Sequence, residues 1–127
     1  MPTTRCPDPD CSVLVIEDDE MLREGLAELF RDEGMDVATA ANGREGLEYL
    51  RSNHAPHVIL LDLMMPVMSG PEFRAEQLGD ASLSAIPVIV LSAAYDARKQ
   101  AAALGAAGYF TKPIKIDKLV AAVRVHC

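Results

Sequence analysis

The feature that most constrains the fold is a strict alternation of short apolar runs with stretches of helical periodicity. Five runs rich in β-branched residues recur along the chain, at Ser12–Ile16, Met35–Thr39, His57–Leu61, Pro87–Leu91 and Gly108–Thr111. The stretches between them carry apolar residues at the spacing of one helical face. Such alternation predicts a parallel sheet with right-handed crossovers and helices on both faces.

Capping and breaking residues set the expected limits of the helices. Gly34 follows the first helix where a left-handed C-terminal cap is expected, and Asn42 is placed to cap the second. We expect helices at about Met21–Phe30, Asn42–Leu50, Pro71–Leu78, Ala94–Leu104 and Asp117–Val125. Five strand–helix units suit a doubly wound, flavodoxin-like α/β fold with strand order 2-1-3-4-5. Residues 1–11 are expected to form a flexible tail, and residues 12–127 one domain.

Polar residues stand where the predicted strands end, which is where open α/β sheets bind ligands. Glu17 and Asp18 follow the first strand, Asp62 the third, Ser92 the fourth and Lys112 the fifth. Clustered carboxylates repel one another, and an oxygen-only site with few protein ligands suits Mg²⁺ or Mn²⁺. One carboxylate can then attack a phosphoryl group whose oxygens the lysine and the serine hydroxyl help to neutralise.

Each of these residues also has a purely structural interpretation. The acids of Glu17–Glu20 suit a helix N-terminus, where the helix dipole favours negative charge. A serine at a strand end is often a turn former, and a lysine there is often a solvated charge. Asp62 is harder to explain in this way, because an acid directly after an apolar central strand has little structural purpose.

Four motifs together resemble the receiver domains of two-component response regulators. They are VLVIEDDEMLR, VILLDLMMPVMSG, PVIVLSA and GAAGYFTKPI, and the resemblance runs from about Val13 to Val125. It implies a receiver fold and a phosphorylation-dependent signalling switch rather than an enzyme acting on outside substrates. The phosphoryl group would come from a sensor histidine kinase or a phosphotransfer protein, and the switch would control a downstream protein partner.

The resemblance also assigns roles at the acidic end of the sheet. Asp62 would be the phosphoacceptor, and Asp18 would bind the metal ion directly. Glu17 would act on the metal largely through water, and the backbone carbonyl of Met64 would be a further ligand. Rival functions fit less well, because a haloacid dehalogenase-type phosphatase needs an acid at Met64, and a flavodoxin-like flavin module needs a phosphate cradle in place of EDDE.

The remaining implied roles concern switching and reset. Ser92 would be the switch hydroxyl, Tyr109 the switch aromatic, and Lys112 would contact the phosphoryl oxygens and precede a cis peptide bond to proline. Met64 and Ala94 occupy the two positions that tune hydrolysis in this family. Neither side chain can hold an attacking water by a hydrogen bond, so we expect a long-lived phosphorylated form. A receiver that acts as a scaffold without phosphorylation is a further alternative.

Composition limits the partners and the cellular address. The net charge of −7 argues against a surface for nucleic acid, and no apolar stretch reaches the roughly 20 residues that span a membrane. The chain start lacks the apolar core of a secretory signal, so a cytoplasmic location is expected. The odd count of cysteines, Cys6, Cys11 and Cys127, suggests free thiols, and their spacing with His126 fits no zinc template. Both a stand-alone receiver and a module of a longer regulator or hybrid kinase remain open.

Overall fold

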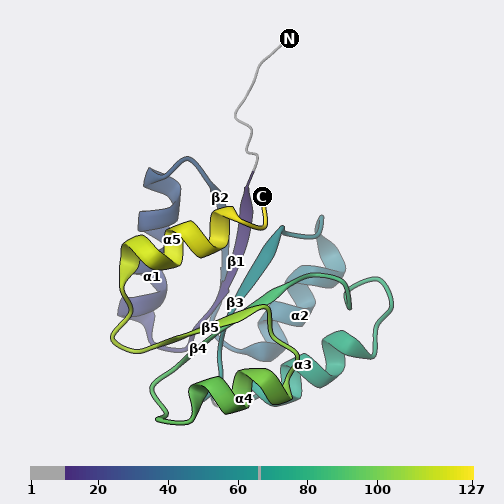
Figure 1. Ribbon diagram of the computed structural model, residues 1–127. Coiled ribbons are helices and arrows are strands. Elements are labelled where there is room, and N and C mark those ends of the chain that lie inside the picture. Colours follow the sequence, from purple (N-terminus) through teal and green to yellow (C-terminus); the bar gives the residue numbers. More distant parts are fainter. Residues whose placement is uncertain (1–10, 66) are drawn as a thin grey trace.

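The computed structural model describes residues 11–65 and 67–127, and its centre is a parallel sheet of five strands in the order β2-β1-β3-β4-β5 (Figure 1). The strands are β1 (Ser12–Ile16), β2 (Asp36–Ala40), β3 (Val58–Asp62), β4 (Val88–Ser92) and β5 (Gly108–Thr111). The helices are α1 (Glu20–Asp32), α2 (Gly43–Ser52), α3 (Gly70–Leu78), α4 (Ala97–Ala103) and α5 (Ile116–Arg124). The expected fold class and strand order are confirmed.

Helices cover the sheet on both faces, with α1 and α5 on one side and α2, α3 and α4 on the other (Figure 1). Every residue of β3 and β4 is buried, as their continuous apolar character predicts for central strands. On the side of α1 and α5 the helices bury Leu26, Ala27, Phe30, Leu119 and Val123. Val120 packs against the same core and is partly buried. In the described part of the chain, no helix combines the length and apolarity needed to cross a membrane.

Local capping explains where most helices begin and end. The Asn42 side chain accepts a hydrogen bond from the Glu45 amide, and Ser69 forms a capping box with Glu72. Gly34 has a φ of 87°, so the predicted left-handed position after α1 is confirmed. These interactions lie within a few residues in the chain, which is why the sequence alone reveals them.

The fourth helix is the element whose start was predicted wrongly. It begins at Ala97 rather than at Ala94, because the Ala94 amide donates a hydrogen bond to Ser92 Oγ (3.0 Å) and belongs to the loop. An alanine-rich stretch has high helix propensity throughout and therefore does not mark its own first residue. The expected N-terminal tail lies outside the described residues except for Cys11, which is buried.

A buried polar network joins α3 to the loop before β4 and to the loop between α4 and β5. Gln77 is fully buried, and its amide nitrogen donates hydrogen bonds of 3.0 Å to the carbonyls of Leu83 and Ile86. Its amide oxygen accepts a bond from Arg74, whose guanidinium also donates to the carbonyls of Leu104 and Gly105. Burial lowers the pKa of Arg74, and the network gives its desolvated guanidinium several oxygen partners.

Gln77→Leu is expected to lower the free energy of unfolding by about 2–4 kcal/mol, because it leaves two buried carbonyls and one guanidinium nitrogen without partners. Urea unfolding followed by circular dichroism would measure the loss. Gln100→Leu is the matched control, since the Gln100 Oε1 atom is already buried without a hydrogen-bond partner among the described residues. The control should be neutral or stabilising, and equal losses in both variants would refute a stabilising role for the network.

Candidate functional site

Three carboxylates converge at the carboxyl ends of β1 and β3. Parallel pairing places Ile16 beside Leu61, so that Glu17 and Asp18 follow β1 at the level where Asp62 ends β3. Glu17, Asp18 and Asp62 each offer a carboxylate oxygen within 4.8 Å of those of the other two. Glu17 and Asp62 are buried and Asp18 is exposed, so the cluster is open to solvent on one side. The three carboxylates therefore lie close together, as the sequence predicts.

Lys112, at the end of β5, supplies the positive charge next to the carboxylates. Its Nζ atom lies 3.1 Å from Glu17 Oε1 and 3.6 Å from Asp62 Oδ1. One ammonium group faces three carboxyl groups, so the site carries an excess of negative charge whenever all three are ionised. Within the described residues, Glu17 Oε1 has no hydrogen-bond donor even though Lys112 is near, because the contact lacks hydrogen-bond geometry.

Burial and the neighbouring charges together shift the pKa values of Asp62 and Lys112. The pKa of Asp62 is raised from 3.8 to about 7, first by burial and then by the carboxyl groups of Asp18 and Glu17, which Lys112 only partly offsets. Burial by itself would lower the pKa of Lys112, but the neighbouring carboxylates outweigh it and the net shift is upward. Asp62 is therefore half protonated near neutral pH without a bound cation, while Lys112 keeps its charge.

The donor set fits a hard divalent cation. All candidate side-chain ligands are carboxylate oxygens, one of them an orphaned buried atom, and the exposed side of the cluster leaves room for water molecules. Mg²⁺ prefers oxygen ligands, uses few carboxylates and retains several waters. A cation here would also remove the repulsion that raises the pKa of Asp62.

The acidic run after β1 contains residues of two kinds: some stabilise the start of α1, and others join the carboxylate cluster. Asp19 is the N-cap of α1, and its Oδ1 atom accepts hydrogen bonds from the amides of Met21 and Leu22. Glu17 and Asp18 instead join Asp62 in the carboxylate cluster. The purely structural interpretation therefore holds for Asp19 and for Glu20 in the first turn of α1, and fails for Glu17 and Asp18.

Arg23 is a residue of this site that the sequence did not reveal. Its guanidinium donates hydrogen bonds to the backbone carbonyls of Glu17 (3.0 Å) and Asp18 (3.5 Å) from the first turns of α1. These bonds fix the backbone that carries two of the carboxylates. Its position in α1, shortly after the acidic run, was a clue in the sequence. That clue is weak, because an arginine in a helix is usually solvated.

The backbone of the β3–α3 loop packs closely around Asp62. The Met64 amide donates to Asp62 Oδ1 (3.3 Å), and the Met64 side chain is 72% exposed. A Cβ atom on Gly70 would lie 2.7 Å from Leu63 Cα and 2.9 Å from the Asp62 carbonyl, so only glycine permits this approach. The start of α3 is thereby held against the end of β3.

The predicted switch residues occupy the ends of β4 and β5. Ser92 is fully buried, its hydroxyl accepts the Ala94 amide, and its carbonyl accepts the Lys112 amide (2.9 Å). The Tyr109 side chain is 41% exposed and does not belong to the buried core. The Lys112–Pro113 peptide bond is cis, as expected. Ser92 and Lys112 are therefore joined through the backbone beside the carboxylates.

Comparison with known families decides how this arrangement is interpreted. The sequence profile of the response regulator receiver domain matches residues 13–124. The chain belongs to the receiver domain family. This assignment favours the receiver interpretation over the phosphatase and flavin-binding alternatives.

Sequence relatives of this receiver are regulatory proteins. It is 36% identical over 115 residues to the transcriptional regulatory protein LnrK of Bacillus subtilis, a match that covers 87% of this chain and 51% of LnrK. It is 37% identical over 116 residues to the DNA-binding response regulator MtrA of Mycolicibacterium paratuberculosis, covering 90% of this chain and 50% of MtrA. The receiver thus spans about half the length of these relatives.

Solved structures confirm the receiver fold. The Francisella response regulator 1452 receiver domain superposes with a TM-score of 0.81 at 30% identity, over 91% of this chain and 95% of the other. TrrA of Thermotoga maritima, solved in complex with Mg²⁺–BeF, superposes with a TM-score of 0.80 at 29% identity, over 92% and 99% of the two chains.

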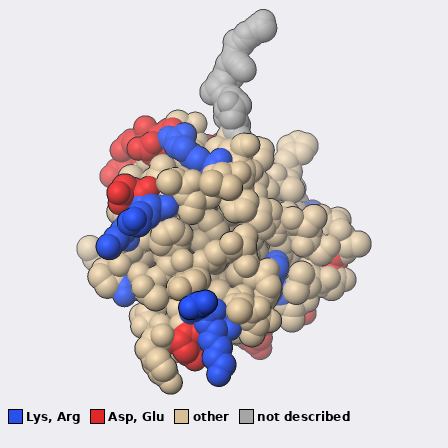
Figure 2. Space-filling model, viewed as in Figure 1, with Lys and Arg blue, Asp and Glu red and all other residues tan. Residues whose placement is uncertain are grey.

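The charge on the surface of this receiver is mixed. In the view of Figure 2, lysine and arginine side chains form small separate groups, and acidic side chains gather mainly over the region of α1. This face presents no continuous basic patch of the kind that binds a nucleic-acid backbone. The expectation of no nucleic-acid contact remains a prediction for this domain, and the names of its longer relatives prevent its extension to a longer protein.

Proposed function

We propose that this receiver accepts a phosphoryl group on Asp62 in the presence of Mg²⁺ or Mn²⁺ and thereby switches the surface around β4 and β5. The observation that carries the proposal is the meeting of three carboxylates with Lys112 at one edge of the sheet. Asp18, Asp62 and the Met64 carbonyl would hold the cation, with Glu17 acting through water. The bound cation would neutralise charge on the transferring phosphoryl group.

Asp62 must be deprotonated before it can act as a nucleophile. With a pKa of about 7 in the metal-free protein, only part of the population is ionised at neutral pH. The ionised Asp62 oxygen would form a bond to phosphorus as the bond from phosphorus to the donor breaks, and the leaving atom would keep the electron pair. Lys112, whose Nζ atom lies near both Glu17 and Asp62, would contact the phosphoryl oxygens as they gain charge.

The switch would follow from the added negative charge. The phosphoryl group offers strong acceptor oxygens, and the Ser92 hydroxyl is a donor that now lies against the Ala94 amide. Turning this hydroxyl toward the phosphoryl group would release the β4–α4 loop, and Tyr109 would move inward beside it. The two-state element is therefore the loop between Ser92 and Ala97 together with the exposed tyrosine ring.

The partners follow from this role. The donor would be a sensor histidine kinase or a phosphotransfer protein, and the output would be a protein that recognises the changed surface. TrrA, whose structure holds Mg²⁺–BeF, supports a comparable ligand for this receiver. A cytoplasmic location suits such a role and belongs to the same proposal.

Incubation with acetyl phosphate and Mg²⁺ tests the function directly. Intact-mass spectrometry should show the addition of one phosphoryl group, which should be absent when a chelator replaces Mg²⁺. Beryllofluoride with Mg²⁺ should shift the amide resonances of the loop from Ser92 to Ala97. If mass and spectrum both stay unchanged with the metal present, the receiver is a scaffold that works without phosphorylation.

We expect Met64→Asn to shorten the lifetime of the phosphorylated receiver several-fold. Asparagine can hold an attacking water by a hydrogen bond, whereas methionine cannot, and the backbone carbonyl is kept. Loss of the phosphoryl mass over time after removal of acetyl phosphate measures the lifetime. Leu78→Asn, half-exposed at the far end of α3, is the control and should leave the lifetime unchanged. Rapid loss in wild type that Met64→Asn does not alter would contradict the prediction.

A further inference from the structure

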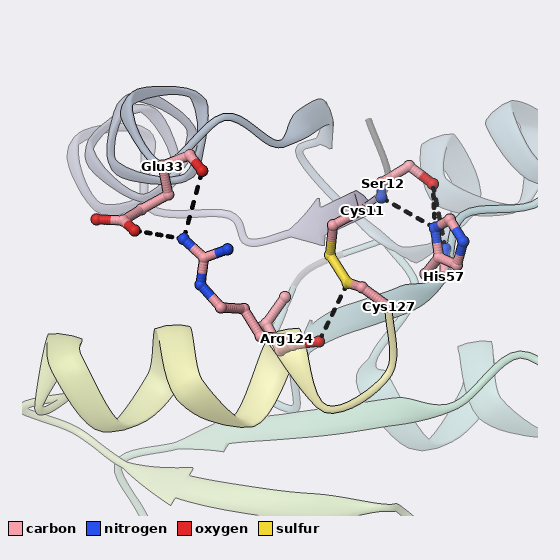
Figure 3. The surroundings of a disulfide bond; sticks show 7 residues. Cys11, Ser12, Glu33, His57, Arg124 and Cys127 are labelled. Atoms are coloured by element: carbon pink, nitrogen blue, oxygen red, sulfur yellow. Dashed lines mark hydrogen bonds and ion pairs between the residues drawn. A yellow bond between two sulfur atoms is a disulfide. The ribbon is translucent and has the colours of Figure 1, made fainter. Parts of the chain in front are cut away.

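The two ends of the described chain are joined by a disulfide bond. Cys11 and Cys127 lie 116 residues apart in sequence, yet their Cα atoms are 4.9 Å apart and their sulfur atoms are bonded (Figure 3). This separation lies within the usual range for disulfides. The sequence-based prediction of free thiols is therefore wrong for these two cysteines. Cys6 lies outside the described residues.

The fold brings both cysteines to the same place from different directions. Cys11 directly precedes β1, and its carbonyl accepts the Asp36 amide (2.9 Å), so the strand pairing with β2 fixes its position. Ser12 and His57 are linked by hydrogen bonds on the other side (Figure 3). Cys127 reaches the same point because α5 runs back across the sheet toward the start of β1 (Figure 1).

Few other contacts hold the C-terminal part of α5. Leu119 and Val123 are its fully buried side chains. Arg124 binds the Glu33 carboxylate and carbonyl, but both side chains are 40–50% exposed, and exposed ion pairs contribute little stability. The disulfide is therefore the strongest restraint on the end of this helix.

We propose that Cys11 and Cys127 form a reversible thiol–disulfide site that responds to small-molecule disulfides and dithiols and sets how firmly α5 is held to the sheet. In the disulfide form, packing holds one end of α5 and the covalent bond holds the other end. In the dithiol form its last turns open more often, because among the described residues they are then held by the packing of Leu119 and Val123, by the partly buried Val120 and Ala122, and by an exposed ion pair.

Formation of the bond requires a two-electron oxidant, and a disulfide such as glutathione disulfide supplies it. The Cys127 thiolate attacks one sulfur of glutathione disulfide and releases one glutathione thiolate. The Cys11 thiolate then attacks the Cys127 sulfur of the mixed disulfide and releases the second. Two protein thiols are oxidised, one disulfide is reduced to two glutathione thiols, and the two protons pass from the protein through solvent to glutathione.

The solvent exposure of the two cysteines determines which sulfur atom reacts first. Cys11 is 6% exposed and packs in the core with α1 and α5, whereas Cys127 is exposed. A small thiol or disulfide therefore reaches the Cys127 sulfur first, in either direction. Reduction must then release a Cys11 thiolate into apolar surroundings, which disfavour the charged form. Reduction is accordingly expected to be slower in the native protein than after unfolding.

The thiol site is separate from the phosphoacceptor site. Cys11 precedes β1, whereas Glu17, Asp18 and Asp62 lie at the opposite, carboxyl ends of β1 and β3. Loss of the disulfide is thus expected to change α5 without changing phosphoryl transfer. This separation lets an experiment distinguish failure of the redox proposal from failure of the proposed signalling function.

The test uses the full chain with Cys6→Ser as background, and compares it with the same chain carrying Cys127→Ser. Cys127→Ser is a mild change, because the residue is exposed and the serine hydroxyl can donate to the Val123 carbonyl, which lies 3.4 Å from the present sulfur. After incubation with glutathione disulfide, both thiols of the background protein should resist alkylation. Dithiothreitol should make both reactive and lower Tm by about 10 °C.

Two measurements decide between the outcomes: the melting temperature of Cys127→Ser and hydrogen exchange in residues 116–127. Cys127→Ser should melt at the temperature of the reduced background protein, with no response of Tm to dithiothreitol. Hydrogen exchange should rise in residues 116–127 on reduction, and phosphorylation by acetyl phosphate should be unchanged. Thiols that stay reactive after oxidant, a dithiothreitol effect that persists in Cys127→Ser, or faster exchange spread across the sheet would each overturn the proposal. Cys11→Ala removes the other cysteine of the disulfide and should give the same results as Cys127→Ser.

Discussion

Asp62→Asn is expected to abolish phosphorylation and to stabilise the metal-free protein at alkaline pH. The amide cannot act as the nucleophile, so no phosphoryl mass should appear. It also carries no charge, so it removes the cost of a buried carboxylate beside Asp18 and Glu17, and it is this burial, together with those two carboxyl groups, that raises the pKa of Asp62 to about 7. A residue that is required for function thus costs stability in the absence of its cation.

The sign of the pH dependence follows from the direction of the pKa shift. Asp62 titrates at about 7 in the folded protein and at about 3.8 when unfolded, so the folded state binds more protons between these values. Its contribution to stability is present below pH 4 and is lost as the pH rises to 7 and above. The shift corresponds to about 2–4 kcal/mol once partial solvent access is allowed for.

Urea unfolding in the presence of a chelator at pH 5 and pH 8 measures this effect. Wild type should lose about 1.5–2.5 kcal/mol more than Asp62→Asn between the two pH values, because part of the total effect falls below pH 5, and Mg²⁺ should restore most of the loss at pH 8. Asp36→Asn, an exposed acid on β2, is the control and should behave as wild type. An equal pH response in Asp62→Asn and wild type would show that Asp62 does not titrate near neutrality.

Lys112→Met is expected to produce the second large effect, with opposite consequences for the fold and for the cation. Its ammonium lies 3.1 Å from Glu17, which is fully buried, and no other cation among the described residues pairs with that carboxylate. Removing one member of a buried pair costs about 3–5 kcal/mol, so metal-free stability should fall by an amount of this order. The affinity for Mg²⁺ should rise several-fold, because the carboxylate cluster becomes more negative.

Calorimetric titration measures the affinity for Mg²⁺, and urea unfolding with and without the cation measures the stability. Lys118→Met is the matched control, since it removes the same charge from an exposed position on α5. In Lys112→Met, beryllofluoride should no longer shift the resonances of the β4–α4 loop, because the contact that links the phosphoryl group to β5 is gone. Unchanged stability and Mg²⁺ affinity would mean that Lys112 is a solvated surface charge, the structural alternative that its sequence position allowed.

The sequence predicts most of the architecture because the signals are local. Apolar runs identify all strands to within about one residue, and side-chain caps such as Asn42 locate helix starts. The carboxylate cluster is also predictable, because the carboxyl ends of parallel strands meet at one edge of a sheet. Asp62 and Lys112 could therefore be placed together although 50 residues separate them in the numbering.

Other features depend on contacts that no local pattern encodes. The division of the acidic run between the Asp19 cap and the Glu17–Asp18 pair depends on how α1 meets the sheet. Arg23 becomes part of the site only because α1 packs beside the loop that it follows. The network of Gln77 needs α3, β4 and their loops to be in place.

The disulfide marks this division most clearly. The strand order, the helices and the edge at which Asp62 meets its neighbours can be predicted from the sequence, because periodicity and strand-end chemistry act over short spans. The pairing of Cys11 with Cys127 follows from the packed fold alone, since three cysteines, two of them 116 residues apart, carry no pairing information in the sequence. The physical reason is that α5 crosses back over the sheet, and the covalent bond forms where that path ends.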